Sequence, residues 1–231
     1  MRRYFLLFMI IISLSLSALG QTEKNKLYIG VAPGITINKL YSSTGYRKDT
    51  NYKNESGFSF AIPLRYEFFH WLAVQADPGL ISKNYKIVHN AYLDGNTYNI
   101  YNNAFINKYL QLPVMAHLSI GGQKLRIFLN AGGFIGYQVG ARLEGVNIII
   151  AYYRYDEKYE FDSRKDNRFE YGILGGLGVK YNTKSWTLFA EGRFHYGLSD
   201  LQKDYMLHQI PRYNNTFLIQ AGILFNFFKS K

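Results

Sequence analysis

The feature that most constrains this chain is a two-residue alternation of apolar and other side chains, which recurs along its length. The clearest example, residues 58–68, places these side chains on its apolar face: Phe58, Phe60, Ile62, Leu64, Tyr66 and Phe68. Successive side chains of a β-strand point to opposite faces of the sheet. Beyond the N-terminus no long stretch has helical periodicity, so the alternation predicts an all-β fold.

Eight segments carry this alternation and predict eight strands. Their approximate ranges are 27–37, 58–68, 72–83, 109–120, 125–139, 169–181, 186–198 and 216–228. The connections alternate between short ones, at 69–71, 121–124 and 182–185, and long ones, at 38–56, 84–108, 140–168 and 199–215. An up-and-down barrel with an even strand number has this asymmetry, because tight turns gather at one end and long loops at the other. We therefore expect an eight-stranded antiparallel up-and-down β-barrel.

The composition of the non-apolar face decides which face of this barrel points outward. Over residues 169–181 that face is mostly small or neutral, with Gly172, Gly176 and Gly178, whereas a solvated surface would be rich in Lys and Glu. Side chains just fill the interior of an eight-stranded barrel, where glycine fits and the large residues of segment 58–68 would not. Aromatic residues also gather toward both ends of the segments, as in the girdles of barrels in lipid. We therefore expect a transmembrane barrel with its apolar face outward.

The N-terminus has the three parts of a secretory signal peptide. Arg2 and Arg3 are followed by an apolar run, and Ala18 and Gly20 are small residues at the expected cleavage positions before Gln21. The run is short for a membrane-spanning helix. We expect a cleaved signal peptide at residues 1–20, a short periplasmic segment at 21–26, the barrel domain at 27–228 and a tail at 229–231. The long loops would then face outward from the cell.

Composition excludes several classes of site. The chain has no Cys, which excludes disulfides, Cys-ligated zinc, iron–sulfur clusters and thiol catalysis. Its formal net charge is +11, but the charge is dispersed over turns, loops and tail, whereas nucleic-acid binding requires a basic patch. The glycine-rich residues 175–178 precede no helix and no Lys-Ser or Lys-Thr pair, unlike a phosphate loop. We expect no nucleic-acid partner, no metal and no cofactor.

Four stretches carry a resemblance to a known family. They are YLQLPV at 109–114, FLNAGGFIGY at 128–137, YGILGGLGV at 171–179 and FAEGRFHYGL at 189–198. Together they resemble the outer-membrane β-barrel family that includes PorT-like proteins, over about residues 27–228. The resemblance implies the outer membrane of a Gram-negative bacterium, typically of the Bacteroidota, and its PorT branch implies type IX secretion. Phe227 and Phe228 resemble the closing aromatic that the barrel-assembly machinery recognises, although Lys229, Ser230 and Lys231 follow them here.

The inward face of the expected barrel carries charged side chains, with His117 and Gln75 among them. The candidate lumen network is Arg65, Glu67, Asp77, Arg126, Glu170, Lys180, Glu191, Arg193 and His195, with Lys83 on the same face. Charges inside a plugged barrel are expected to pair, because an unpaired buried charge costs several kcal/mol. We expect a structural role for these residues. Our specific hypothesis is that Arg65, Glu67, Asp77, Arg126, Glu191 and Arg193 form one network; a gated polar path is the alternative.

Catalytic signals are weak. His195 shares a strand face with Glu191 and Arg193, and its nearest serine along the chain is Ser199. A serine hydrolase needs a nucleophile, a base and an acid in mutual contact, and the chain has no G-x-S-x-G motif. We therefore expect no enzyme activity, with a lipid A hydrolase or acyltransferase as the alternative.

The long loops hold most of the 21 Tyr, together with many Asn, Ser and Gly, a mixture typical of adaptable recognition surfaces. Residues 146–155 should form a hairpin that turns near Asp156 and Glu157. The candidate partner surface there is Ile148, Ile149, Ile150, Tyr152, Tyr153 and Tyr155. We expect a monomeric, non-enzymatic outer-membrane barrel with a structural or binding role, surrounded by outer-membrane lipid. The alternatives are a PorT-like secretion accessory with an envelope partner, a narrow channel, and a lipid-modifying enzyme.

Overall fold

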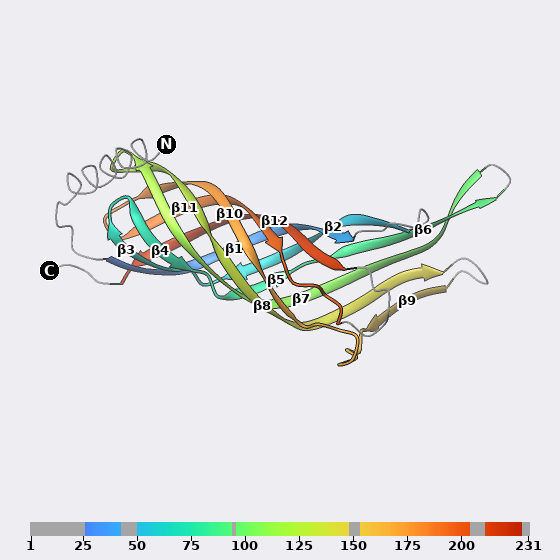
Figure 1. Ribbon diagram of the computed structural model, residues 1–231. Coiled ribbons are helices and arrows are strands. Elements are labelled where there is room, and N and C mark those ends of the chain that lie inside the picture. Colours follow the sequence, from blue (N-terminus) through green and yellow to red (C-terminus); the bar gives the residue numbers. More distant parts are fainter. Residues whose placement is uncertain (1–25, 43–49, 94–95, 148–152, 204–210, 228–231) are drawn as a thin grey trace, which may run out of the picture.

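The computed structural model describes residues 26–42, 50–93, 96–147, 153–203 and 211–227 (Figure 1). The expected signal peptide, the first five residues of the periplasmic segment, and the tail lie outside these ranges. Within them every regular element is a β-strand: β1 (Lys26–Ser42), β2 (Thr50–Ala61), β3 (Leu64–Phe69), β4 (Leu72–Ala76), β5 (Gly79–Ser82), β6 (Tyr85–Leu93), β7 (Asn96–Gly121), β8 (Leu125–Asn147), β9 (Tyr153–Lys158), β10 (Phe169–Asn182), β11 (Trp186–Gly197) and β12 (Arg212–Asn226). None of the described residues belongs to a helix long and apolar enough to cross a membrane.

The strands pair antiparallel in one sheet that returns on itself. From β1 the pairings run through β12, β11, β10 and β8 to β7, and from β7 through β4 and β3 back to β1. Tyr28 faces Asn226 at one end of the β1–β12 pair and Ser42 faces Arg212 at the other. The first and last described strands therefore lie side by side over their whole length (Figure 1).

The structure has twelve strands where the alternation predicted eight, and proline causes two of the divisions. Pro63 separates β2 from β3, and Pro78 lies in the break between β4 and β5. Proline has no N–H to donate to a neighbouring strand, but both carbonyl groups still accept, Pro63 from Gly30 N at 3.0 Å and Pro78 from Ile62 N at 2.9 Å. The pairing of β1 passes from β2 to β3 without a shift in register. These breaks are therefore local interruptions of continuous pairing.

Much of what was expected to be long loops is strand. β6 and the first part of β7 occupy the range 84–108, and the end of β8 with β9 occupies part of 140–168. The hairpin expected near residues 146–155 exists, since Arg142 to Asn147 pair with Lys158 to Tyr153. Its expected turn at Asp156 and Glu157 is wrong, because both residues lie in β9. The β6–β7 and β8–β9 hairpins extend at the end of the molecule opposite the β3–β4 turn (Figure 1).

The burial of side chains is inverted relative to a water-soluble protein. Apolar residues point outward and remain exposed, as with Ile35 and Leu177, each 61% exposed. Charged residues point inward, as with Arg65 and Arg193, each 1% exposed. This agrees with the outward apolar face predicted from the glycine-rich inner face. Exposed apolar patches far larger than a few hundred Å² are unusual on soluble monomers.

Among the described residues, buried apolar side chains form two small clusters inside the sheet. One consists of Ala32, Phe128, Phe189 and Leu224, and the other of Met115, Phe134 and Leu174. Glycine makes room for these rings, since a Cβ added at Gly178 would overlap the Phe128 ring and the carbonyl oxygen of Ala190. Most of the other buried residues in the described chain are polar or charged, and they form the candidate site.

Candidate functional site

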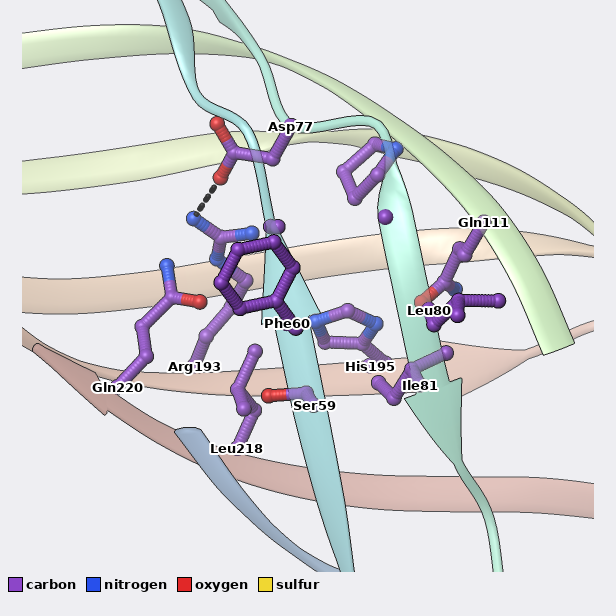
Figure 2. A pocket seen from close by; sticks show the side chains of 13 residues that line it. Ser59, Phe60, Asp77, Leu80, Ile81, Gln111, Arg193, His195, Leu218 and Gln220 are labelled. Atoms are coloured by element: carbon purple, nitrogen blue, oxygen red, sulfur yellow. Dashed lines mark hydrogen bonds and ion pairs between the residues drawn. The ribbon is translucent and has the colours of Figure 1, made fainter. Parts of the chain in front are cut away.

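The central part of the interior is organised around Arg193 on β11. Its Nη2 lies 2.7 Å from Asp77 Oδ2 (Figure 2). The same Nη2 lies 2.9 Å from Glu191 Oε2, and Nε donates to Glu191 Oε1 at 3.0 Å. Alternation places Glu191 and Arg193 on the same face of β11, and Asp77 comes from the break between β4 and β5. One guanidinium thus holds two carboxylates, and all three side chains are at most 3% exposed.

Neutral amide side chains saturate the carboxylates of this centre. Glu191 also accepts from Asn130 Nδ2 at 2.7 Å and from Gln220 Nε2 at 3.1 Å. Asp77 accepts from Gln75 Nε2 at 2.8 Å, and Gln75 in turn accepts from Arg65 Nε at 2.7 Å. Sequence reasoning missed Asn130 and Gln220, although both occupy inward positions of their strands. A buried hydrogen-bonded network of this kind rigidifies the interior.

The network continues toward the tight turns through His117. Its Nδ1 lies 2.7 Å from Asn130 Oδ1, and its Nε2 lies 3.2 Å from Lys180 Nζ. Because Lys180 can only donate, the proton of His117 belongs on Nδ1, where it is donated to Asn130. Lys180 Nζ also lies 3.5 Å from Glu67 Oε1. A single path of hydrogen bonds therefore connects Glu67 to Asp77 and Arg65.

A separate ion pair lies nearer the hairpin end. Lys83 Nζ lies 2.8 Å from Glu170 Oε2, and the two side chains are 0% and 1% exposed. Asn214 Nδ2 donates to the other oxygen of Glu170 at 3.3 Å. The Lys83 ammonium also lies 4.5 Å from the centroid of the Phe134 ring, within the range of a cation–π interaction.

The predicted lumen residues other than His195 thus fall into three groups. The structure brings Arg65, Glu67, Asp77, Glu191 and Arg193 together, with Lys180 as a sixth member, and places Glu170 in the separate pair with Lys83. Arg126 is not joined to the network by a hydrogen bond or ion pair; its Nη1 donates to the carbonyl oxygen of His70 in the β3–β4 turn. The reason is position, because Arg126 is at the turn end of β8, one residue after the strand begins.

His195 is buried without a hydrogen bond. Both ring nitrogens lack a partner among the described residues, and the ring packs at 5.3 Å from the centroid of Phe134. With Ser59 and Gln111 it lines an interior cavity of about 20 Å³ (Figure 2). Ser199 Oγ accepts instead from Tyr171 N at 3.1 Å. The set weighed for catalysis, His195 with Glu191 and Ser199, is therefore not assembled.

A larger cavity of about 160 Å³ lies at the hairpin end of the interior. Aromatic side chains form much of its wall: the Tyr85 and Phe105 rings stack at 4.9 Å, and Phe105 meets Tyr159 edge-on at 6.4 Å. Burial raises the pKa of Tyr85 above its ordinary value. The pKa of Tyr159 is also raised, chiefly by burial and to a smaller extent by the neighbouring Asp166. Both hydroxyls therefore stay neutral at ordinary pH and act as hydrogen-bond donors or acceptors.

The floor and rim of this outer cavity are polar. Asn107 and Gln138 form the floor, joined by a 2.8 Å hydrogen bond from Gln138 Nε2 to Asn107 Oδ1. Asp166 and Arg212 contribute opposite charges at the rim. Binding sites for small molecules combine apolar walls with a few converging polar groups in this way.

The candidate partner surface lies mostly outside the described residues. Ile148, Ile149, Ile150 and Tyr152 belong to that part of the chain, and of Tyr153 only the backbone, at the start of β9, is described. The Tyr155 hydroxyl hydrogen-bonds to Asn103 Oδ1 on β7. No group of three or more His, Cys, Asp or Glu side chains in the described ranges is arranged to hold a metal ion.

Comparisons with known proteins agree with this architecture. A family model described as outer membrane protein beta-barrel domain matches residues 19–203. No curated protein matches the chain.

Solved structures with a similar chain path include small outer-membrane proteins. Neisserial surface protein A (NspA) is 16% identical, with a TM-score of 0.44, covering 89% of this chain and 100% of its own. OprG from Pseudomonas aeruginosa is 10% identical, with a TM-score of 0.49 and coverage of 91% and 99%. The outer membrane protease OmpT from Escherichia coli is 12% identical, with a TM-score of 0.40 and coverage of 88% and 96%. On the family match, which spans most of its length, this chain belongs to the outer membrane protein β-barrel domain family.

Proposed function

We propose that this protein is an eight-stranded transmembrane barrel of the outer membrane that is non-enzymatic and binds a ligand at its hairpin end. The strand number rests on continuity of register. β4, β5 and β6 as far as His89 pair with β7 in one register, as β2 and β3 do with β1. Eleven of the twelve described strands therefore reduce to eight continuous runs, and β9 adds to β8 outside them. Closure satisfies every backbone group that faces lipid, which a membrane-spanning sheet requires.

The proposed orientation places the tight turns in the periplasm and the hairpins outside the cell. Aromatic residues support a membrane boundary at the turn end, where Phe69 stacks on Trp71 and Tyr181 meets Trp186. The proposal includes export by a signal peptide at residues 1–20, cleaved to leave the periplasmic segment at 21–26, and a monomeric barrel at 27–228. A Bacteroidota source and insertion by the barrel-assembly machinery belong to the same proposal.

The observation that carries the binding role is the blind outer cavity. Its floor at Asn107 is tied to the backbone oxygen of Lys83 by a 3.1 Å hydrogen bond. The buried Lys83–Glu170 pair and the Arg193 centre fill the interior of the barrel. Eight strands leave room only for side chains inside. A ligand can therefore enter the outer cavity, but the barrel offers no continuous path for ions.

Two measurements test this function. In planar bilayers the wild-type protein should give no conductance steps, because the lumen is plugged. In lipid nanodiscs, a panel of monosaccharides, amino acids and nucleosides should include a member that raises the unfolding temperature. Tyr159→Ala, in the cavity wall, should abolish that rise, whereas Tyr181→Ala at the turn end should not. Conductance by the wild type, or stabilisation that Tyr159→Ala leaves intact, would contradict the proposal.

A PorT-like accessory role in secretion is the second candidate, and β9 favours it. Within the described chain β9 pairs with β8 on one side and has no strand on the other. A free strand edge accepts an extended segment of a partner. Co-purification of secretion components with the full chain, and their loss when residues 142–158 are replaced by a short turn, would support this role. Retention of those components by the shortened protein would count against it.

A further inference from the structure

A second open cavity, of about 390 Å³, lies at the turn end of the interior, opposite the outer cavity. Its wall is formed by the start of β1, the β3–β4 turn, the β7–β8 turn and the β10–β11 turn. We call it the turn-end vestibule and define it by its lining residues: Lys26, Tyr28, Glu67, His70, Gly121, Gly122, Gln123, Arg126, Asn182 and Thr183.

Positive charge exceeds negative charge in this region. Glu67 is the single carboxylate in the lining, against Lys26 and Arg126. Lys180, buried with its Nζ 3.5 Å from Glu67, adds a third cation beneath the wall. Arg65 adds a fourth, and its Nε donates to the neutral Gln75.

The central cluster offsets this excess only in part, because its two carboxylates accompany one cation, Arg193. Asp77 and Glu191 both accept hydrogen bonds from Arg193. Their remaining described partners are neutral amides, those of Gln75, Asn130 and Gln220. A cavity lined mostly by charges of one sign concentrates ions of the opposite sign.

Two arginine side chains near the vestibule also retain unused donors. Arg126 Nη1 donates to the carbonyl oxygen of His70, but its Nε is buried without a partner among the described residues. Arg65 Nη2 is likewise buried without a partner. A buried donor on a charged group costs free energy while it is unpaired. An acceptor with negative charge would satisfy both the hydrogen-bond deficit and the charge excess.

We propose that the turn-end vestibule binds a small oxyanion, a phosphate or carboxylate group, held chiefly by Arg126 with Lys180 beneath it. Guanidinium groups bind the oxygens of such anions in pairs through parallel N–H bonds. The anion comes either as a free ion or as the headgroup of an anionic lipid at the membrane surface. This site is independent of the outer cavity, so failure of either proposal leaves the other standing.

The test is titration of the full-length mature protein with inorganic phosphate, in phosphatidylcholine nanodiscs at low salt, by isothermal calorimetry. Saturable binding that weakens with added NaCl is expected. Arg126→Gln should lower the affinity about tenfold, and Glu67→Gln should raise it by a similar factor, as expected for one unit charge within a few ångströms of the anion. Opposite effects of two neutral replacements distinguish a charge site from general loss of structure.

Arg142→Gln is the matched control. Arg142 is an exposed arginine of the β8–β9 hairpin, ion-paired with Asp156 at the other end of the molecule. This variant should bind phosphate as the wild type does. If Arg126→Gln does not fold, Glu67→Gln and Lys180→Met carry the test, with affinity raised in the first and lowered in the second. Absence of saturable binding, or equal affinities in the wild type and the charge variants, would overturn the proposal.

A final experiment distinguishes whether the anion is a free ion or a lipid headgroup. Nanodiscs that contain phosphatidylglycerol should weaken apparent phosphate binding if the headgroup occupies the vestibule. Unchanged phosphate binding in these nanodiscs would assign the site to a free ion.

Discussion

At the scale of single residues, the buried guanidinium of Arg193 determines how the interior responds to mutation. Glu191→Gln removes one of the two carboxylates that Arg193 holds and leaves the arginine with Asp77 alone. Breaking a buried pair by removing one partner typically costs about 3–5 kcal/mol. We therefore predict that Glu191→Gln lowers the unfolding temperature. That temperature is measured by heating gel samples to a series of temperatures and recording where the band of folded protein disappears. Asp156→Asn, which breaks the exposed pair with Arg142, should shift that temperature little.

His195 should respond in the opposite direction. Its two nitrogens have no described partner, and the adjoining cavity of about 20 Å³ gives room for a slightly larger ring. Replacing a buried unsatisfied polar group by an apolar one of similar shape is close to neutral or stabilising. His195→Phe should therefore keep or raise the unfolding temperature in the same assay. A fall comparable to that of Glu191→Gln would show that His195 has a partner in the folded protein.

At the scale of the strand, two glycines of β10 make a matched pair. Gly178 points inward beneath the Phe128 ring, whereas a Cβ added at the outward Gly175 would meet nothing within 4 Å. Gly178→Ala should therefore reduce the yield of folded protein on refolding into detergent micelles, while Gly175→Ala should leave it unchanged. Equal yields would mean that the ring and strand adjust to the extra methyl group.

Prediction from sequence succeeded for strands in which only one face is apolar. The alternation at residues 58–68 correctly indicated which side chains point outward. It did not indicate that residues 85–93 form a strand, because both faces of that segment mix apolar and polar residues, such as Ile87 with His89 and Val88 with Asn90. Candidate site residues were placed on the correct face, but their partners were not predictable. Asp77 and Arg193, for instance, are 116 positions apart and meet only when β4 and β11 face each other across the interior.

The whole molecule presents an apolar outer surface around a charged interior. Ile120, Leu125 and Phe227 are 72%, 63% and 68% exposed. Such a surface is stable in lipid and unstable in water. We predict that the protein sediments with the outer membrane, resists extraction by carbonate or high salt, and is released by detergent. Recovery of folded protein in the soluble periplasmic fraction would contradict this.

The pairing of the first described strand with the last has a consequence for biogenesis. β1 gains its partner along one edge only when β12, the last strand in the described part of the chain, is available. Until then each end of the growing sheet exposes unpaired backbone groups, the feature that leads sheets to aggregate. Contacts between the ends of a chain are also the slowest to form. The edges of β1 and β12 therefore need protection from aggregation until the two strands pair.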